Sequence, residues 1–172
     1  FEKMQPGSLG STYDDREQPM QKHMEAMAEL QEFAFPVAPW MFGAAGVEHN
    51  QKYGSTPEHF ARIAVKNHAH SVHNPYSQFQ DVYTEQQIID AKMIYAPGQL
   101  TRPMCSPTSD GSGAAIVVSE AFVDKHGLAS QAVEIVGQAL VTDTPGTFES
   151  KSMATLVGAD MSRTAANRVY EQ

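Results

Sequence analysis

The stretch GAAIVVSEAFVDKHG (residues 113–127) joins two kinds of secondary structure and decides the fold class. Residues 113–118 are apolar and rich in β-branched side chains, a pattern typical of a buried strand. Ser119 can cap a following helix, which Gly127 ends. Because AVEIVGQALV (132–141) also reads as a strand, this half of the chain predicts an α/β fold, with a mixed sheet covered by helices.

The residues before this stretch predict helices and loops. MQKHMEAMAELQEFAF (20–35) places methionines and Leu30 at helical spacing, and we expect these side chains to pack against a neighbouring element. PVAPW (36–40) carries two prolines and is expected to break the helical pattern. MFGAAGVEHNQKYG (41–54) predicts a helix closed by Gly54.

The next helix is predicted from its start signals. In STPEHFARIAVKNHAH (55–70), either Ser55 or Thr56 can cap the helix, and Pro57 suits its first turn. Glu58 can complete a capping box with Ser55. Three further helices are expected in this way: one after Thr84, with Gln87 in a second capping box, and two in FESKSMATLVG (148–158) and SRTAANRVYEQ (162–172), the last capped by Ser162.

Composition limits the classes of function. The chain has 172 residues, 41% hydrophobic and 19% charged, a balance typical of one globular domain or two small lobes. Its formal net charge of −8 and the absence of a Lys/Arg run disfavour nucleic acid and anionic membranes as partners. A single cysteine, Cys105, excludes an internal disulfide and favours a reducing compartment. No apolar run approaches the roughly 18 residues of a membrane span.

Three histidines lie close together in KNHAHSVHNPYSQFQ (66–80). On a helix, His70 and His73 stand three residues apart and could share a metal ion, whereas His68 points elsewhere. Neither an HExxH pattern nor paired cysteines accompany them. The alternative is a polar helix end that runs into a turn, and we expect no metal site here.

Cys105 and the turn after it allow two interpretations. The thiol could be a nucleophile, but the sequence assigns no histidine to it as a base, so a small buried side chain entering a strand is the alternative. The turn CSPTSDGSG (105–113) crowds hydroxyl groups and Asp110 before two glycines. Such a turn can offer amide and hydroxyl hydrogen bonds to a ligand.

Four stretches together resemble a known family. The chain is similar to the thiolase superfamily, in particular to its sterol carrier protein X type and to related bacterial proteins called lipid-transfer proteins or acetyl-CoA acetyltransferases. The stretches that carry this similarity are FEKMQPGSLG, PVAPWMFGAAGVEHNQKYG, KNHAHSVHNPYSQFQ and CSPTSDGSGAAIVVSEAFV. Thiolases contain two similar βαβαβ halves, with a loop domain inserted in the first. The resemblance therefore implies a partial thiolase fold, a helical loop domain followed by strand–helix elements of both halves.

The resemblance also implies how the chain is divided. Residues 1–104 correspond to the end of a first-half strand, at FEKM, plus the inserted loop domain. Residues 105–131 correspond to the returning last strand and helix of the N-terminal half, and residues 132–172 to the start of the C-terminal half. The catalytic cysteines and histidines of the family fall outside an internal fragment of this kind, and Cys105 matches neither cysteine. The resemblance thus implies no catalytic residue in this segment, which alone is expected to be inactive.

Three residues correspond to substrate contacts in the family. Ser106 matches the serine of a Ser-x-x-x-Asp-Gly turn that contacts the pantetheine arm of coenzyme A. Met41 matches a methionine beside the acyl pocket. Trp40 stands where thiolases often have histidine, so this polar contact is altered. No metal and no permanently bound cofactor are implied, because coenzyme A is a substrate.

The resemblance implies an acyl-CoA acyltransferase, acting in thiolysis of 3-ketoacyl-CoA or in acetyl transfer, with acyl-CoA and coenzyme A as ligands. A thiolase-like aldolase that cleaves steroid side-chain CoA esters with a small OB-fold partner is one alternative, and a non-catalytic acyl-CoA or lipid carrier is another. The full protein is expected to be a homodimer or tetramer, cytoplasmic in a bacterium or peroxisomal in a eukaryote. The isolated chain is expected to be unstable or associated, because the strand at 113–118 would expose an unpaired apolar edge.

Overall fold

The computed structural model describes residues 14–171 except 17, 19 and 35, so the strand expected at FEKM lies outside the described residues. The described part is mixed α/β, with many helices and a small two-stranded sheet. Within it, none of the helices is both long and apolar enough to cross a membrane. The elements in chain order are α1 (Gln21–Leu30), α2 (Val37–Tyr53), α3 (Pro57–Ser71), α4 (Glu85–Ile89), β1 (Met93–Tyr95), β2 (Leu100–Thr101), the 3₁₀ helix η2 (Arg102–Met104), α5 (Glu120–His126), α6 (Pro145–Glu149), α7 (Met153–Leu156) and α8 (Ala159–Tyr170).

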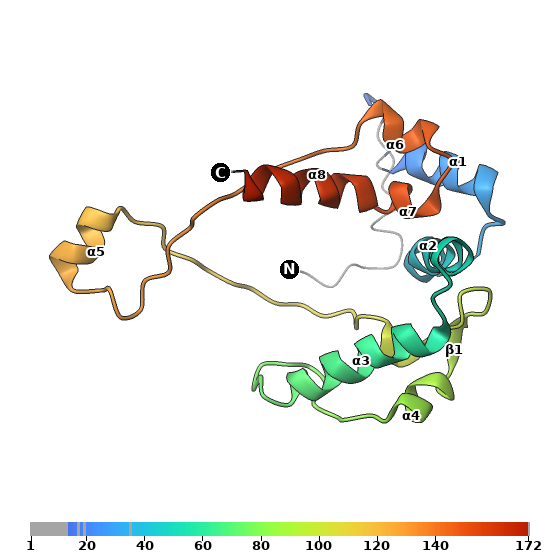
Figure 1. Cartoon of the computed structure of the whole chain (residues 1–172), viewed down its shortest axis with the longest axis horizontal. Helices are drawn as coiled ribbons and strands as arrows, with labels where there is room; N and C mark the ends of the chain where they lie inside the picture. The colour runs from blue at the N-terminus through green and yellow to red at the C-terminus, as the bar shows by residue number, and fades with distance from the viewer. Residues whose placement is uncertain (1–13, 17, 19, 35, 172) are drawn as a thin grey trace.

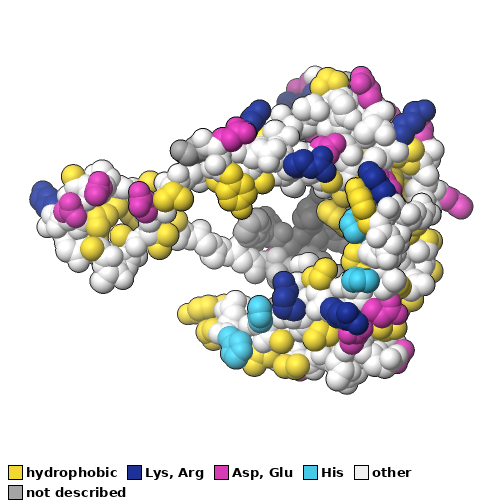
Figure 2. Space-filling model, viewed as in Figure 1, with side chains coloured by type: hydrophobic (Ala, Val, Ile, Leu, Met, Phe, Trp, Pro, Cys, Tyr) yellow, Lys and Arg dark blue, Asp and Glu magenta, His cyan; other side chains and the backbone are white. Residues whose placement is uncertain are grey.

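Helix α2 lies between two groups of elements (Figure 1). On one side it contacts α7, which also packs against α1, α6 and α8. On the other side it contacts β1, close to α3 and α4. Helix α5 projects away from both groups at the end of two extended segments (Figure 1), and hydrophobic and acidic side chains share the surface of this projection (Figure 2).

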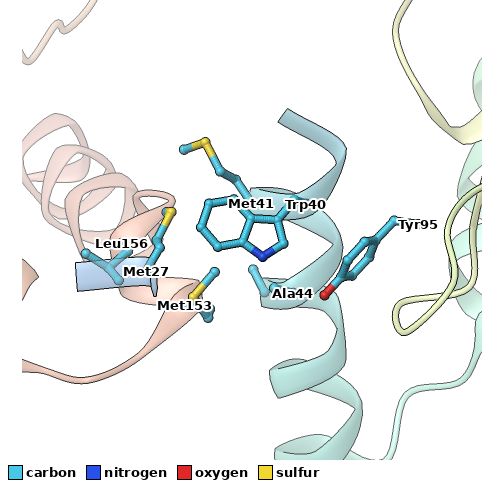
Figure 3. Packing of buried hydrophobic residues seen from close by; sticks show 8 residues of the cluster. Met27, Trp40, Met41, Ala44, Tyr95, Met153 and Leu156 are labelled. Atoms are coloured by element: carbon cyan, nitrogen blue, oxygen red, sulfur yellow. The ribbon is translucent and has the colours of Figure 1, made fainter. Parts of the chain in front are cut away.

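The main core forms where α1, α2, β1 and α7 meet. Met27 and Trp40 are fully buried there, and Tyr95, Met153 and Leu156 pack around them (Figure 3). The expected packing is confirmed for Met27, which is in the core, and for Met24 and Leu30, which pack against it. It is wrong for Met20, which precedes α1 and is exposed. This core fixes the position of α2.

A smaller core joins α3 to α4 through Ala61, Ala64 and Ile88. The buried Thr101 hydroxyl donates a hydrogen bond of 2.7 Å to the Ile88 carbonyl oxygen. Strands β1 and β2 pair antiparallel, with a register shift between Met93 and Tyr95. The chain after β2 is thereby held against α3 and α4.

The predicted break before α2 is present, since α1 ends at Leu30, but the expectation that the next helix starts only after PVAPW is wrong, because α2 begins at Val37. Pro36 is the N-cap of α2, and Pro39 lies in its first turn. The first N–H groups of a helix have no intrahelical partner, so a proline there removes no hydrogen bond. The predicted C-terminal cap is confirmed, because Gly54 ends α2 with a left-handed φ of 69°.

Most predicted helix starts are confirmed, with one change of partner. Thr56 caps α3, and its box is completed by His59 rather than Glu58. The His59 Nδ1 atom accepts a hydrogen bond of 3.0 Å from the Thr56 N–H. The capping box of Thr84 and Gln87 is present, as is the Ser119 cap of α5, which a left-handed Gly127 ends.

The C-terminal helices differ from the prediction in their bounds. FESKSMATLVG forms parts of two short helices, α6 and α7, because the backbone turns at Lys151, whose φ is 49°. Ser152 caps α7 by accepting a hydrogen bond from the Thr155 N–H. Ser162 lies inside α8, which instead begins after Gly158, with a φ of 102°.

The two predicted buried strands are also corrected. Residues 113–118 and 132–141 form neither strand nor buried core, and Ile116 and Val133 are 91% and 90% exposed. A strand needs a neighbour to pair with its N–H and C=O groups, and within the described part of the chain no strand runs beside either segment. The sequence pattern indicates that these residues favour a β-sheet, but the described residues do not form the sheet that these segments would join.

Candidate functional site

An open cavity of about 400 Å³ lies between α2, α3 and the segment from residue 98 to residue 107. Its walls are mainly apolar and its polar groups are few, which is the usual character of a small-molecule site. The large apolar side chains of its lining are Phe42, Phe60, Ile63, Leu100 and Met104. The side chains of Asn67, His68 and Ser106 contribute polar atoms.

Two lining glycines allow the backbones to approach closely. A Cβ atom on Gly43 would lie 2.3 Å from Cδ1 of the Tyr95 ring, which packs against α2 at this point. A Cβ on Gly98 would lie 2.7 Å from the Gly43 carbonyl oxygen. The loop between β1 and β2 can therefore rest on α2 only because both positions lack a side chain.

His68 connects α3 to the opposite wall of the cavity. Its Nε2 atom lies 3.0 Å from the Pro103 carbonyl oxygen, a hydrogen bond in which a protonated Nε2 donates. Its ring also meets Tyr83 edge to face, with the centroids 4.8 Å apart. These contacts hold η2 against α3, so His68 both lines the cavity and fixes its shape.

The remaining histidines of the cluster lie on the surface. His70 is exposed in the last turn of α3, and His73 is exposed in the turn that follows the helix, so the two do not share a helical face. Within the described residues, no group of three or more His, Cys, Asp or Glu side chains is arranged to hold a metal ion.

Cys105 lines the same cavity and is partly buried. Its thiol lies 3.6 Å from the Thr101 carbonyl oxygen, to which it donates a hydrogen bond. Burial raises the pKa of the Cys105 thiol above its ordinary value of about 9. Because the thiolate is the nucleophilic form, this environment suits a neutral lining residue and not an activated nucleophile.

The three residues expected to contact substrate are not brought together. Ser106 is exposed and lies in the lining of the cavity. Trp40 and Met41 are 0% and 8% exposed in the main core, which α2 shares with α1 and α7. Instead, Phe42, the next residue of α2, lines the cavity. The sequence does not distinguish these neighbours, because all three are apolar.

Two buried polar atoms of the main core lack partners within the described part of the chain. They are Nε1 of Trp40 and the hydroxyl oxygen of Tyr95. Figure 3 shows Ala44 of α2 between the indole nitrogen of Trp40 and the hydroxyl oxygen of Tyr95. Burial raises the pKa of the Tyr95 phenol, and the nearby Gln31 side chain acts in the opposite direction but more weakly.

Comparison with known proteins identifies relatives of the chain as a whole. No family model matches the chain. Sterol carrier protein 2 of Rattus norvegicus is 53% identical over 173 residues, which cover 100% of this chain and 31% of that protein. Non-specific lipid-transfer protein-like 2 of Caenorhabditis elegans is 45% identical over 177 residues, 100% of this chain and 42% of that protein.

A more distant relative is an enzyme by name. Benzoylsuccinyl-CoA thiolase subunit BbsB of Thauera aromatica is 25% identical over 147 residues, which cover 86% of this chain and 36% of that subunit. The chain thus spans about a third of the length of the curated relatives it matches. These similarities make the chain a homologue of sterol carrier protein 2 and of thiolase-family members, consistent with a fragment of a thiolase-superfamily protein.

Proposed function

We propose that this chain forms the binding wall for an acyl-CoA thioester in an acyltransferase of the thiolase superfamily. The observation that supports it is the cavity between α2 and α3, whose lining is mainly apolar and has Ser106 among its few polar groups. An acyl-CoA presents a matching combination, an apolar acyl group joined to a pantetheine arm with amide groups. The Ser106 hydroxyl can hydrogen-bond such an arm, and the aromatic side chains can cover the acyl group.

In this proposal, the chain binds and shields the thioester, and the covalent chemistry belongs to residues outside residues 1–172. Acyl transfer through a cysteine needs a thiolate with a base or a positive environment beside it. The neutral Cys105 thiol does not supply one.

Trp40 and Met41 keep a role in the proposal, although both are buried in the main core. They pack α2 against α1 and α7 and so set where Phe42 stands in the cavity wall. Whether they also touch an acyl group is a further prediction, which needs the core to open.

A second function, lipid or acyl-CoA carriage without turnover, is favoured by the neutral Cys105 thiol and by the apolar cavity lining. The two functions differ in what must be recognised. A lipid carrier needs only the apolar chain, whereas an acyl-CoA carrier and the thiolase-like function need the pantetheine arm as well.

Calorimetric titration of the 172-residue chain tests the proposal with octanoyl-CoA, coenzyme A and octanoate. We expect saturable binding of octanoyl-CoA, with the Ser106→Ala substitution weakening it by about fivefold, the value of one hydrogen bond. Ser109→Ala, in the same turn but outside the cavity lining, is the matched control. Equal binding of octanoate and octanoyl-CoA, both insensitive to Ser106→Ala, would favour the carrier. No binding of either thioester or fatty acid would overturn both functions.

A further inference from the structure

Gly46 lies in the middle of α2 and lines the cavity. A Cβ atom built on it would lie 3.8 Å from Cζ of Phe60, an ordinary van der Waals contact, and would meet no closer neighbour. The packing of the described residues therefore leaves room for a methyl group at this position. Gly46 also has the backbone conformation of its helix, so no left-handed φ requires glycine there.

Gly43, one helical turn earlier, provides the contrast. It lines the same cavity, but a side chain there would collide with the Tyr95 ring. Packing explains Gly43 and does not explain Gly46. Glycine in the middle of a helix is destabilising relative to alanine, because it loses more backbone freedom on folding. What the chain gains from glycine at position 46 is open space opposite Phe60.

We propose that Gly46 determines how large an apolar group the cavity admits. The identity of that group as the acyl chain of a CoA thioester rests on the function proposed above. A methyl group at position 46 would narrow the cavity toward Phe60, and a larger side chain would fill the space between α2 and α3. Short acyl groups would still bind, whereas longer ones would be excluded.

The first test compares Gly46→Ala and Gly46→Leu with the original chain in calorimetric titrations of acetyl-, butyryl-, octanoyl- and lauroyl-CoA. Both substitutions use strong helix formers, so the melting temperature should stay the same or rise. We expect Gly46→Leu to weaken the binding of octanoyl- and lauroyl-CoA by about tenfold or more, the scale of losing methylene contacts in an apolar pocket, and to leave acetyl-CoA unchanged. Gln51→Ala, at an exposed position of the same helix, is the matched control.

The second test reads the size of the cavity without coenzyme A. Cys105 is the single cysteine and lines the cavity, so the rates at which N-methyl-, N-butyl- and N-octylmaleimide label it report access for groups of increasing length. Gly46→Leu should slow labelling by N-octylmaleimide relative to N-methylmaleimide by several-fold, and Gln51→Ala should change neither rate.

The two tests separate the two claims. If the original chain binds no acyl-CoA but Gly46→Leu still slows the long maleimide selectively, the function proposed above fails and the role of Gly46 stands. If Gly46→Leu changes all acyl-CoA affinities equally and slows all maleimides equally, or changes none of them, the role of Gly46 is overturned.

Discussion

Glu48 on α2 and Ser152 at the start of α7 are joined by a hydrogen bond of 2.5 Å, which the Ser152 hydroxyl donates to the Glu48 carboxylate. The second carboxylate oxygen accepts a hydrogen bond of 3.2 Å from the backbone N–H of Ala154. The first N–H groups of a helix need partners, and a negative charge at this end is favourable. One partly buried carboxylate therefore fixes the cavity-bearing helix to the C-terminal helices.

Replacing Glu48 should destabilise the fold. Glu48→Ala leaves the Ala154 N–H and the Ser152 hydroxyl without their acceptor, and we expect the free energy of unfolding to fall by about 1–3 kcal/mol. Urea denaturation followed by circular dichroism measures this change. Glu134→Ala removes the same charge at an exposed position and should have little effect. Equal losses in both variants would mean that the Glu48 contacts contribute nothing specific.

The main core should depend strongly on Trp40. This side chain is fully buried between α1, α2 and α7, so Trp40→Ala should lower the free energy of unfolding by about 3–5 kcal/mol. The rings of Phe33 and Trp40 meet edge to face, with their centroids 5.1 Å apart, but Phe33 is 54% exposed. Phe33→Ala should therefore lower the free energy of unfolding clearly less than Trp40→Ala. Urea titrations of the two variants compare these costs, and a Phe33→Ala loss as large as that of Trp40→Ala would contradict the described core.

Thiol labelling should show an elevated pKa at Cys105. Burial raises this pKa above about 9, so the thiolate fraction in the folded chain is smaller than in an exposed cysteine at the same pH. The rate of reaction with a small disulfide reagent should rise with pH, and the midpoint of this rise should lie at a higher pH in the folded chain than in the urea-unfolded chain. A midpoint in the folded chain at the same pH as in the unfolded chain, or at a lower pH, would contradict the burial of the thiol.

The same shift predicts the sign of a stability change. The neutral thiol is favoured in the folded chain, so its contribution to stability is fully present below the unfolded-state pKa. It is lost as the pH rises through the higher folded-state value. Cys105→Ala should therefore reduce the loss of stability above about pH 9, which urea titrations at pH 7 and at pH 10 measure. If Cys105→Ala loses as much stability between pH 7 and pH 10 as the original chain, the loss is due to other groups, such as Tyr95.

The two extended apolar segments should promote association of the isolated chain. Ile116 and Val133 are almost fully exposed in segments with the composition of buried strands. Such segments pair readily with other chains. The double substitution Ile116→Lys and Val133→Lys should shift the chain toward the monomer in size-exclusion chromatography with light scattering. Tyr76→Lys changes an equally exposed side chain in a loop outside both segments and should leave the association unchanged. A monomeric original chain would contradict this account.

The helix ends could be predicted from the sequence because their signals are local. Each helix cap acts within one turn of its own helix. The predicted caps that the structure contains are the capping box of Thr84 with Gln87, the N-cap Ser119 and the C-cap Gly127. Whether residues 113–118 form a strand could not be predicted in the same way, because β-branched residues show only a preference for a sheet. Whether a strand forms depends on a partner, and the described residues supply none.

The cavity was only partly predictable. The turn at residues 105–113 indicated a ligand-binding segment without distinguishing its hydroxyl groups, and the family resemblance selected Ser106, which lines the cavity. The contributions of Phe60 and Gly46 depend on how α2 and α3 pack, which no local pattern states. The histidine cluster drew attention to one residue of the cavity, His68. Its ring lines the cavity and hydrogen-bonds the Pro103 carbonyl oxygen.

The most direct test of the central claim is to map acyl-CoA binding on the chain by two-dimensional ¹H–¹⁵N nuclear magnetic resonance. Octanoyl-CoA should shift the amide signals of Gly43, Gly46, His68 and Ser106 along one saturable curve. The signals of Thr164 and Arg168, which line a separate cavity beside α8, should stay unchanged. Saturable shifts confined to Thr164 and Arg168, or no saturable shift at any position, would contradict the assignment of the binding site to the cavity between α2 and α3.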